Sequence, residues 1–495
     1  MEDKKSYKES LKATALFGGV KVFTILINLV RTKVIAVLLG PEGMGIANLF
    51  QSTTNLISAS TNFGIGTSAV RDIAEANAAN NEQRIATVIK VFRYLVWITG
   101  LLGAGICLIL APYLSRITFG SNDYTIAFVL LSCTLLFQQL TSGQTTLLQG
   151  MRKYAYMAKS SVYGNILGLL FTVPLYFIWG FDAIVPVLIL SSVISLLLSW
   201  WYSSKVKTIP VSVNYSTIKT EGTGMVKMGF FISLNGLFTL AGAYVLRIYI
   251  GNTGGIVDVG LYAAGFTLVN TYVGLIFNAM TKDYYPRLSA ASNDTVKFNE
   301  TINAQLTIGL LLIAPVIVAF IVYINWIIII LFSSKFIPVT GMIYWATFAV
   351  FFKITASSIA FSFLAKRDTK AFFYSEVSFI LYMLLFNIIG YTFWGLTGLG
   401  ISYLITYCCY LIQVWTICSK RHQVSVQLRI LKFFSVQLTF VLAAILLVIF
   451  APAKFHYTAG TLCVLLSMLF SYKELDKKIH LTQIIRSKIK RNKNN

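Results

Sequence analysis

Charged residues are scarce in this chain of 495 residues: Asp, Glu, Lys and Arg make up 12% of it, whereas 56% is hydrophobic. Its mean hydropathy is +0.73. A soluble protein of this size could not solvate itself with so few charges, so the composition excludes an ordinary soluble domain. A membrane-spanning helix needs roughly 20 apolar residues, and the chain supplies about fourteen such runs. We therefore predict an all-α polytopic membrane protein.

Several sequence features of enzymes are also missing. No GxxxxGK[ST] phosphate-binding sequence occurs, so ATP does not drive the chain directly. The three histidines lie outside the apolar runs, which argues against a buried imidazole relay. All six cysteines fall within apolar runs, so neither a disulfide framework nor a zinc site is indicated. No outer connector could house a polymerase or ligase active site. We predict that the protein is not an enzyme and has no metal or other cofactor.

The basic residues predict the orientation of the chain in the membrane. With the N-terminus inside, three of the 41 Lys and Arg lie in outer connectors, five lie within spans and the remainder are cytoplasmic. This is the positive-inside pattern, and it places both termini in the cytoplasm. No cleaved signal peptide is indicated. The predicted spans are residues 13–39, 46–69, 92–113, 125–148, 160–179, 183–202, 228–250, 259–281, 303–324, 341–364, 371–390, 395–418, 432–450 and 457–472.

An internal repeat divides the chain into halves. The sequence that starts at Met44-Gly45 resembles the one that starts at Val259-Gly260, at an offset close to 215 residues. Repeats of equal span parity are parallel and usually flank a central pathway. The predicted parts are an N-terminal lobe (1–205), a flexible cytoplasmic linker (206–227), a C-terminal lobe (228–419), two additional spans (420–472) and a basic cytoplasmic tail (473–495).

Cations occur inside the predicted spans with almost no anions beside them. The five cations are Lys21, Arg31, Lys33, Arg247 and Lys353, and the comparable acidic residue is Glu376. A charge at bilayer depth costs several kcal/mol and is usually kept where it faces a bundle interior or a watery cavity. A lumen of this charge predicts an anionic cargo.

The predicted cavity combines these cations with polar side chains. On the first span, Lys21, Thr24, Asn28 and Arg31 share one helical face. Arginine offers a planar fork for phosphate and lysine a point charge, a pair that suits a diphosphate. We predict a cationic cavity made by Lys21, Arg31, Arg247 and Lys353. Its polar lining is predicted from Thr24, Asn28, Gln138, Gln144 and Ser357, with Glu376 as a candidate for ion coupling.

Structural roles are the alternatives for the same residues. Lys33 lies near the outer end of its span, where its side chain can extend to the membrane surface. Arg31 and Arg247 can bond backbone carbonyls. The glutamines of the fourth span can bond neighbouring helices instead of sugar hydroxyls. Glu376 can pair with Lys370 or Arg367.

Long stretches of the chain look familiar. VKVFTILINLVRTKVIAVLLGPEGMGIANLFQ, LLQGMRKYAYMAKSSVYGNILG and LFSSKFIPVTGMIYWATFAVFFKITASSIAFSFLAKRDTKAFFYSEVSFIL resemble the Wzx-type O-antigen and enterobacterial common antigen translocases. These form a polysaccharide-transporter branch of the superfamily that also holds the MATE exporters and MurJ. The likeness covers nearly the whole chain as a pattern, without a short signature.

The resemblance implies a V-shaped bundle of two six-helix lobes in a MATE-like arrangement. Such a bundle would move an undecaprenyl-diphosphate oligosaccharide, such as the O-antigen repeat unit of lipopolysaccharide, across the bacterial inner membrane to its periplasmic leaflet. The run FAVFFKITA departs from the pattern, because it lacks an acidic residue before Lys353. The energy source stays open, as does the choice between acting alone and acting beside a polysaccharide polymerase and glycosyltransferases.

Two other functions compete with a flippase. A MATE-type antiporter of cationic drugs or metabolites would favour acidic lumen residues, of which Glu376 is the available one. A membrane enzyme of polysaccharide assembly would need catalytic carboxylates or a larger outer domain. A scaffold would have no reason to bury five cations.

Overall fold

The computed structural model describes residues 19–20 and 23–479. The described residues form helices joined by turns and irregular connectors, and they contain no strand. A first helix covers residues 23–38. The elements that follow are α2 (Gly40–Thr61), α3 (Ile65–Ala78), α4 (Glu82–Ile109), α5 (Ala111–Phe119), α6 (Thr125–Gly150), α7 (Tyr154–Trp179), α8 (Ile184–Ser203), α9 (Tyr215–Gly254), α10 (Ile256–Thr267), α11 (Gly274–Ala290), α12 (Thr295–Leu331), α13 (Thr340–Ala365), α14 (Thr369–His422), α15 (Leu428–Phe450) and α16 (Ala453–Ile479).

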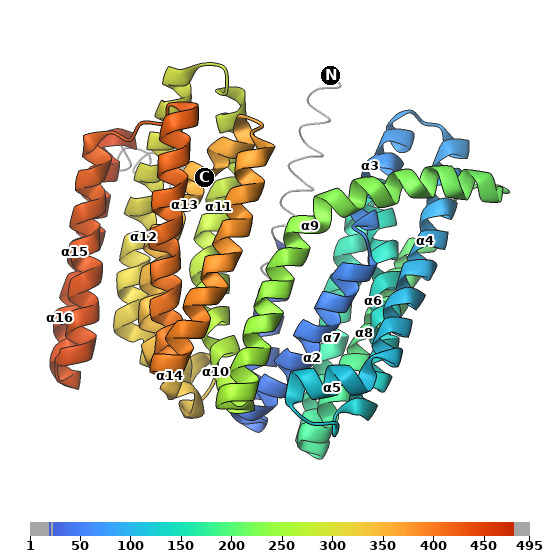
Figure 1. The fold of residues 1–495 in the computed structure, drawn as a ribbon, viewed down its shortest axis with the longest axis horizontal. Coiled ribbons are helices and arrows are strands. Elements are labelled where there is room, and N and C mark those ends of the chain that lie inside the picture. The colour runs from blue at the N-terminus through green and yellow to red at the C-terminus, as the bar shows by residue number, and fades with distance from the viewer. Residues whose placement is uncertain (1–18, 21–22, 480–495) are drawn as a thin grey trace, which may run out of the picture. The chain divides into compact units, whose positions relative to one another are not determined.

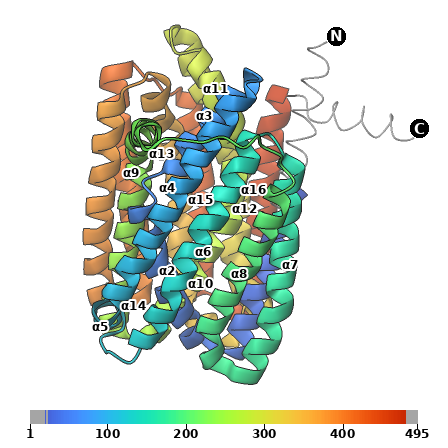
Figure 2. The ribbon, with the colours of Figure 1, turned by 90° about the vertical axis from the view of Figure 1, so that its right-hand side faces the viewer.

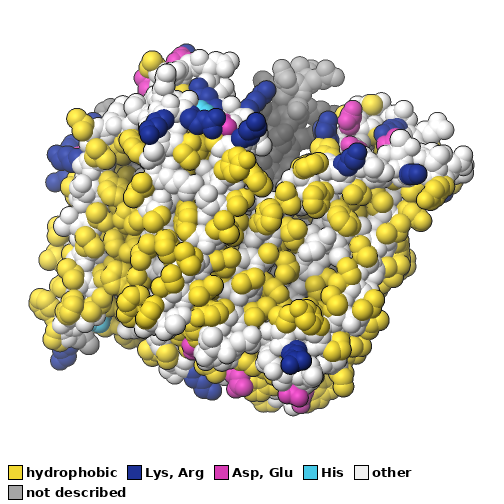
Figure 3. All heavy atoms as spheres, in the orientation of Figure 1, with side chains coloured by type: hydrophobic (Ala, Val, Ile, Leu, Met, Phe, Trp, Pro, Cys, Tyr) yellow, Lys and Arg dark blue, Asp and Glu magenta, His cyan; other side chains and the backbone are white. Residues whose placement is uncertain are grey.

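The chain is an all-α polytopic membrane protein, as predicted. Nine stretches of the described residues are long and apolar enough to cross a membrane. Two of them hold a pair of helices each. Tyr154–Ser203 contains α7 and α8, joined by a short 3-10 turn at Gly180–Ala183. Thr369–His422 turns at Gly395, whose φ of 56° and ψ of −139° are not helical, so α14 is a hairpin. Within each unit defined below, hydrophobic side chains cover the middle of the face in Figure 3.

Two compact units make up the chain. The first unit holds Met1–Gly260 with Leu331–Ser333, and the second holds Leu261–Ile330 with Ser334–Asn495. In the first unit α6 packs against both α4 and α8, and α7 packs against α8 (Figures 1 and 2). In the second unit α13 packs along both arms of the α14 hairpin, and α15 packs against α16.

The predicted linker is partly helical. Residues 215–227 form the first turns of α9, which cross the ends of α3 and α4 before the helix descends beside α2 (Figure 1). Arg84 fixes this part of α9 with two bonds from its guanidinium to the Glu221 carboxylate, at 2.6 and 2.9 Å. Helix α9 therefore packs within the first compact unit, although the sequence places its span at the start of the second lobe. The two lobes as moving bodies stay a prediction.

The corresponding helix is interrupted in each of the two repeats. The predicted span 46–69 is broken, because α2 ends at Thr61 and α3 begins at Ile65. Gly64 lies between them with a φ of 61°, and its N–H donates to the Asn62 side chain at 2.8 Å. In the second repeat a π-helical turn, Leu268–Val273, separates α10 from α11 within the predicted span 259–281. Single π turns recur at functional sites.

The two repeat sequences meet at glycines. A Cβ atom on Gly260 would lie 1.8 Å from the carbonyl oxygen of Pro41, and one on Gly45 would lie 2.1 Å from that of Ile256. Both neighbours are backbone atoms, which cannot rotate away. The residues that reveal the repeat in the sequence therefore also allow the start of α2 to touch the start of α10, backbone against backbone.

A polar clamp ties the connector between α14 and α15 to α12. The Asn299 side chain donates to the carbonyl of Gln423 and accepts from the N–H of Ser425, at 3.0 and 2.9 Å. One turn later, Asn303 donates to the carbonyl of Ser425 and accepts from the N–H of Gln427, both at 3.0 Å. The two amides pair with the extended connector as a neighbouring strand would.

Buried polar contacts also join the last two helices. The Gln437 side chain of α15 is fully buried, donates to Ser471 at 2.8 Å and accepts from Ser467 at 2.7 Å, both on α16. We expect Gln437→Leu to destabilise the protein, and a double-mutant cycle with Ser471→Ala to give a coupling of about 0.6 kcal/mol, with an upper limit near 1.7 kcal/mol. Unfolding in detergent measures it. Additive effects of the two substitutions would show that the contact contributes nothing.

Candidate functional site

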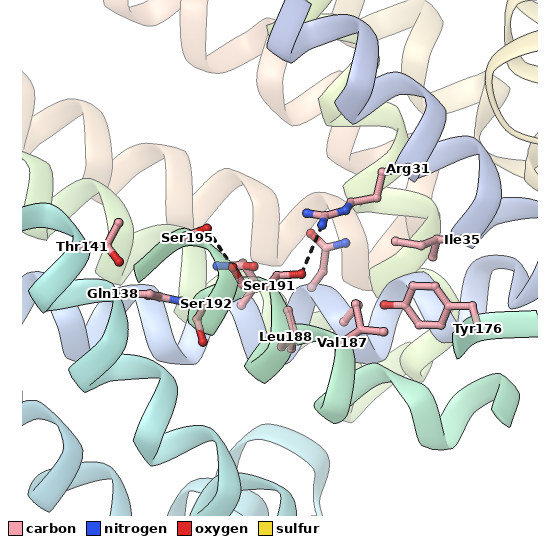
Figure 4. A pocket seen from close by; sticks show the side chains of 13 residues that line it. Arg31, Ile35, Gln138, Thr141, Tyr176, Val187, Leu188, Ser191, Ser192 and Ser195 are labelled. Atoms are coloured by element: carbon pink, nitrogen blue, oxygen red, sulfur yellow. Dashed lines mark hydrogen bonds between the residues drawn. The ribbon is translucent and has the colours of Figure 1, made fainter. Parts of the chain in front are cut away.

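A polar cavity lies inside the first unit. Its volume is about 420 Å³, and its walls come from the first helix, α2, α6, α7 and α8 (Figure 4). The walls are partly apolar, through side chains such as Ile35 and Val187, and otherwise carry amides and hydroxyls. The polar side chains lining it are Arg31, Asn48, Gln51, Gln138, Thr141, Tyr176, Ser191, Ser192 and Ser195.

Arg31 supplies the charge of this cavity. Its Nη2 atom donates to the hydroxyl of Thr172 at 3.3 Å. It also donates to the hydroxyl of Ser191 at 3.2 Å (Figure 4). Gly168 makes room for it, because a Cβ there would lie 2.9 Å from Nη2. The Nε atom of Arg31 is buried without a hydrogen-bond partner among the described residues. Two weak neutral partners leave a guanidinium under-satisfied, since it has five donors.

In the part of the chain that the structure describes, no carboxylate neutralises Arg31. None of the residues that line the cavity is acidic, and no ion pair of Arg31 occurs among the residues that the structure describes. A partly buried cation without a counter-ion is costly, and an anionic ligand would relieve that cost. The cavity therefore has the electrostatics of an anion site.

The rest of the lining suits a hydroxylated ligand. Gln138, one of the predicted polar residues, lines the cavity from α6 beside Thr141 (Figure 4). Ser192 and Ser195 donate to carbonyls of their own helix, at 2.7 and 2.8 Å, so their oxygens keep acceptor capacity toward the cavity. Amides and hydroxyls of this kind can exchange hydrogen bonds with sugar hydroxyls.

Three predicted residues of the N-terminal half do not line the cavity, and a fourth, Lys21, falls outside the described residues. Thr24 is half-buried and Asn28 exposed on the first helix, and neither lines the cavity. Gln144 accepts a hydrogen bond from Ser203 at 2.5 Å and faces a different hollow, between α4, α6 and α8.

Two other cations of the predicted spans, Arg247 and Lys33, contact backbone carbonyls in the first unit. Arg247 donates to the carbonyl of Ala243, one turn earlier on α9, at 3.0 Å, and it does not line the cavity. This contact matches the structural alternative for Arg247. Lys33 donates to the carbonyl of Phe332 at 2.5 Å, so its ammonium is held by the protein rather than extended alone to the membrane surface.

Lys353 forms a second cationic group, in the second unit. Its Nζ atom donates to the Asn270 side chain at 3.0 Å and contacts the Tyr403 hydroxyl at 3.1 Å. The Tyr403 hydroxyl also donates to Asn270, at 3.1 Å. Asn270 belongs to the π turn, so the interruption of the helix positions the hydrogen-bond acceptor of Lys353. Ser357, one turn after Lys353, is half-buried and forms no hydrogen bond among the described residues.

Glu376 forms no ion pair among the residues that the structure describes. The Tyr410 hydroxyl donates to its carboxylate at 2.8 Å. The expected alternative, pairing with Lys370 or Arg367, is not found; Asp368 makes the local ion pair instead, with Arg421 at 3.4 Å. A half-buried acid bonded to a tyrosine keeps the capacity to bind a proton or a small cation.

Several lining residues were not predicted from the sequence. Ser191, Ser192 and Ser195 of α8 face the cavity, and their spacing in an otherwise apolar run was a usable signal. Asn270 and Tyr403 could not be found this way, because their meeting with Lys353 depends on the π turn. Among the described residues no group of three or more His, Cys, Asp or Glu could hold a metal ion.

An all-α membrane fold with a charged cavity inside a helical unit is typical of membrane transporters. A family model described as "Polysaccharide biosynthesis protein" matches residues 34–341, and the chain belongs to this family. Two relatives, the lipid III flippases of Escherichia coli (strain K12) and of Shigella flexneri, are each 22% identical over 400 residues. Each match covers 77% of this chain and 93% of the relative.

Solved structures share the fold. The lipid II flippase MurJ in an inward closed conformation aligns with a TM-score of 0.66 at 17% identity, over 94% of this chain and 99% of that one. An inward-facing multidrug resistance MATE family transporter of the MOP superfamily aligns with a TM-score of 0.64 at 17% identity, over 81% and 96%. These proteins are named as flippases and transporters rather than as enzymes, in agreement with the prediction that the chain is not an enzyme. The predicted resemblance is confirmed at the level of family and fold.

Proposed function

We propose that the protein is a flippase that carries an undecaprenyl-diphosphate-linked oligosaccharide, the repeat unit of O-antigen or a related surface polysaccharide. The observation that carries this proposal is Arg31, a cation without a carboxylate partner in a cavity otherwise lined by amides and hydroxyls. A diphosphate would neutralise the guanidinium, and the sugars would bond Gln138 and the serines. The names of the lipid III and lipid II flippases support the same class of cargo.

The proposed mechanism is alternating access by two lobes. The diphosphate and sugars occupy the polar cavity while the polyprenyl tail remains in lipid. Lys353, held by Asn270 and Tyr403, offers a second preorganised cation for the anion. A membrane potential that is positive outside favours outward movement of an anion by about 2.3 kcal/mol per charge per 100 mV. The membrane potential could therefore supply part of the free energy for transport.

The proposed location is the bacterial inner membrane, with both termini in the cytoplasm. Support comes from the distribution of Lys and Arg among the predicted connectors. Polysaccharide polymerase and glycosyltransferases are the proposed neighbours, because they would consume and supply the cargo.

Transport in proteoliposomes tests the proposal. A fluorescent undecaprenyl-diphosphate oligosaccharide is placed in both leaflets, and a membrane-impermeant reagent that destroys the label reports how much reaches the outer one. We expect nearly complete loss of the label with protein and about half without it, for at least one oligosaccharide of a panel. No transfer of any panel member by folded protein, together with export of a cationic dye, would establish the antiporter instead.

For ion coupling we propose Glu376. If its carboxylate carries the coupling ion, an imposed proton or sodium gradient should accelerate the wild type, and Glu376→Gln should abolish the acceleration while transfer without a gradient persists. Tyr410→Phe is the matched control, because it removes the hydrogen bond and keeps the acid. Equal acceleration in wild type and Glu376→Gln would exclude this residue from coupling.

A further inference from the structure

A second hollow lies in the first unit, beside a face of α6 that does not line the Arg31 cavity. It has a volume of about 890 Å³ and lies between α4, α6, α8 and the connector that follows α8. Figure 2 shows α6 between α4 and α8. Side chains of α4 and α8 line the hollow on either side of α6. The floor is apolar, through Leu136, Phe137 and Leu140 of α6. Trp97 and Trp200 border it with rings that are 50% and 61% exposed.

Two cations lie at this hollow. Arg93 lies near the middle of α4, and Lys207 lies in the connector after α8. Both are exposed, and neither forms a hydrogen bond or ion pair with the described residues. The connector is fixed beside α4, because Lys90 donates to the carbonyl of Val211 at 2.6 Å. The hollow thus joins an apolar floor and open tryptophan rings to two unpaired positive charges.

This hollow is distinct from the Arg31 cavity. The two share no lining residue, although both use α6 and α8. Gln138 and Thr141 of α6 face the Arg31 cavity, whereas Phe137 and Leu140 face the hollow. Occupancy of one site therefore does not require occupancy of the other.

We propose that the hollow is a binding site for an anionic phospholipid of the surrounding bilayer. The phosphate lies between Arg93 and Lys207, and the acyl chains lie on the α6 floor and against the two tryptophans. Basic pockets between membrane helices bind anionic headgroups, and tryptophan is enriched at the headgroup level. Charge complementarity selects an anionic over a zwitterionic lipid by about fivefold for each cation.

Tryptophan fluorescence in nanodiscs tests the site. Phosphatidylcholine nanodiscs receive a small fraction of lipid with brominated acyl chains, either phosphatidylglycerol or phosphatidylcholine, and quenching is titrated. We expect the wild type to be half-quenched at a roughly 25-fold lower fraction of phosphatidylglycerol, since each of the two cations contributes about fivefold. The difference between the two lipids should vanish in the double variant Arg93→Gln and Lys207→Gln. The amplitude of quenching should fall in the double variant Trp97→Phe and Trp200→Phe.

Matched controls separate this result from a general loss of charge. Arg116→Gln with Lys159→Gln removes one exposed arginine and one exposed lysine elsewhere in the same unit and should leave the preference unchanged. Arg31→Gln should also leave it unchanged, so a failure of the flippase proposal would not affect this one. Equal quenching by both lipids in the wild type overturns the proposal, as does a preference that survives in Arg93→Gln with Lys207→Gln. Displacement of phosphatidylglycerol by equimolar undecaprenyl diphosphate would overturn the assigned occupant.

Discussion

Gly260→Ala is expected to abolish the native packing of α2 and α10. The added Cβ would lie 1.8 Å from the Pro41 carbonyl oxygen and 3.0 Å from the backbone nitrogen of Gly45, so the two segments must separate. Inserting a methyl group into close packing typically costs about 1–3 kcal/mol, and rigid backbone on both sides places this site at the upper end of that range or beyond it. We expect a low yield of folded protein, a lowered Tm and no transport.

The repeat partner provides a direct check on this reasoning. Gly45→Ala should have a similar effect, and the double variant should cost less than the sum of the two, since one separation relieves both clashes. Gly105→Ala in α4 is the matched control, because no atom lies within 4 Å of the new Cβ. A wild-type Tm and wild-type transport in Gly260→Ala would refute the close contact.

Substitution of Arg31 should produce the largest purely functional loss. Arg31→Gln keeps a donor for Ser191 but loses the charge, and Arg31→Lys keeps the charge but loses the planar fork. A hydrogen bond to a charged group contributes about 1.5–3 kcal/mol, which corresponds to a loss of about ten- to hundredfold in transport rate for Arg31→Gln. Arg31→Lys should be intermediate. Initial rates of flipping in proteoliposomes measure both.

The interpretation of these rates depends on stability. The contacts of Arg31 with Thr172 and Ser191 are long hydrogen bonds to neutral hydroxyls, so their loss or weakening should change the Tm little. Arg116→Gln, an exposed arginine outside the cavity, is the matched control and should transport normally. If folded Arg31→Gln flips at the wild-type rate, Arg31 has a structural role and the diphosphate is held elsewhere.

Much of the helical architecture could be predicted because apolar runs of this length have few alternatives. The predicted spans at 125–148 and 183–202 agree with α6 and α8 to within a few residues. The interruptions were missed. Hydropathy does not register a break of three residues at Asn62–Gly64 or a π turn, since neither changes the apolar composition. The polar, basic composition of 206–227 predicts a flexible linker, whereas the helical start of α9 within it depends on contacts that the sequence does not reveal, such as that of Arg84 with Glu221.

The site was predicted unevenly for a related reason. A charge inside an apolar run is visible in the sequence, so Arg31 and Lys353 can be singled out from it. Whether such a charge faces a cavity or its own helix depends on local rotation and on neighbours. Arg247 and Arg31 look alike in the sequence, yet one contacts a backbone carbonyl and the other two hydroxyls of other helices. A single sequence holds no information on that choice.

The clamp made by Asn299 and Asn303 has a consequence for how this protein can be altered. All four of its bonds end on main-chain atoms of the connector at residues 423, 425 and 427. The side chains are thus less constrained than the spacing, although proline cannot replace Ser425 or Gln427, whose N–H groups donate, and the φ of 54° at Gln423 disfavours β-branched residues. Inserting or deleting one residue between 423 and 427 would displace the donors and acceptors on one side of the change by one place, so the four bonds could no longer form together. A reporter dye can therefore be attached here through a substituted side chain, whereas an epitope tag inserted into the connector would break the clamp.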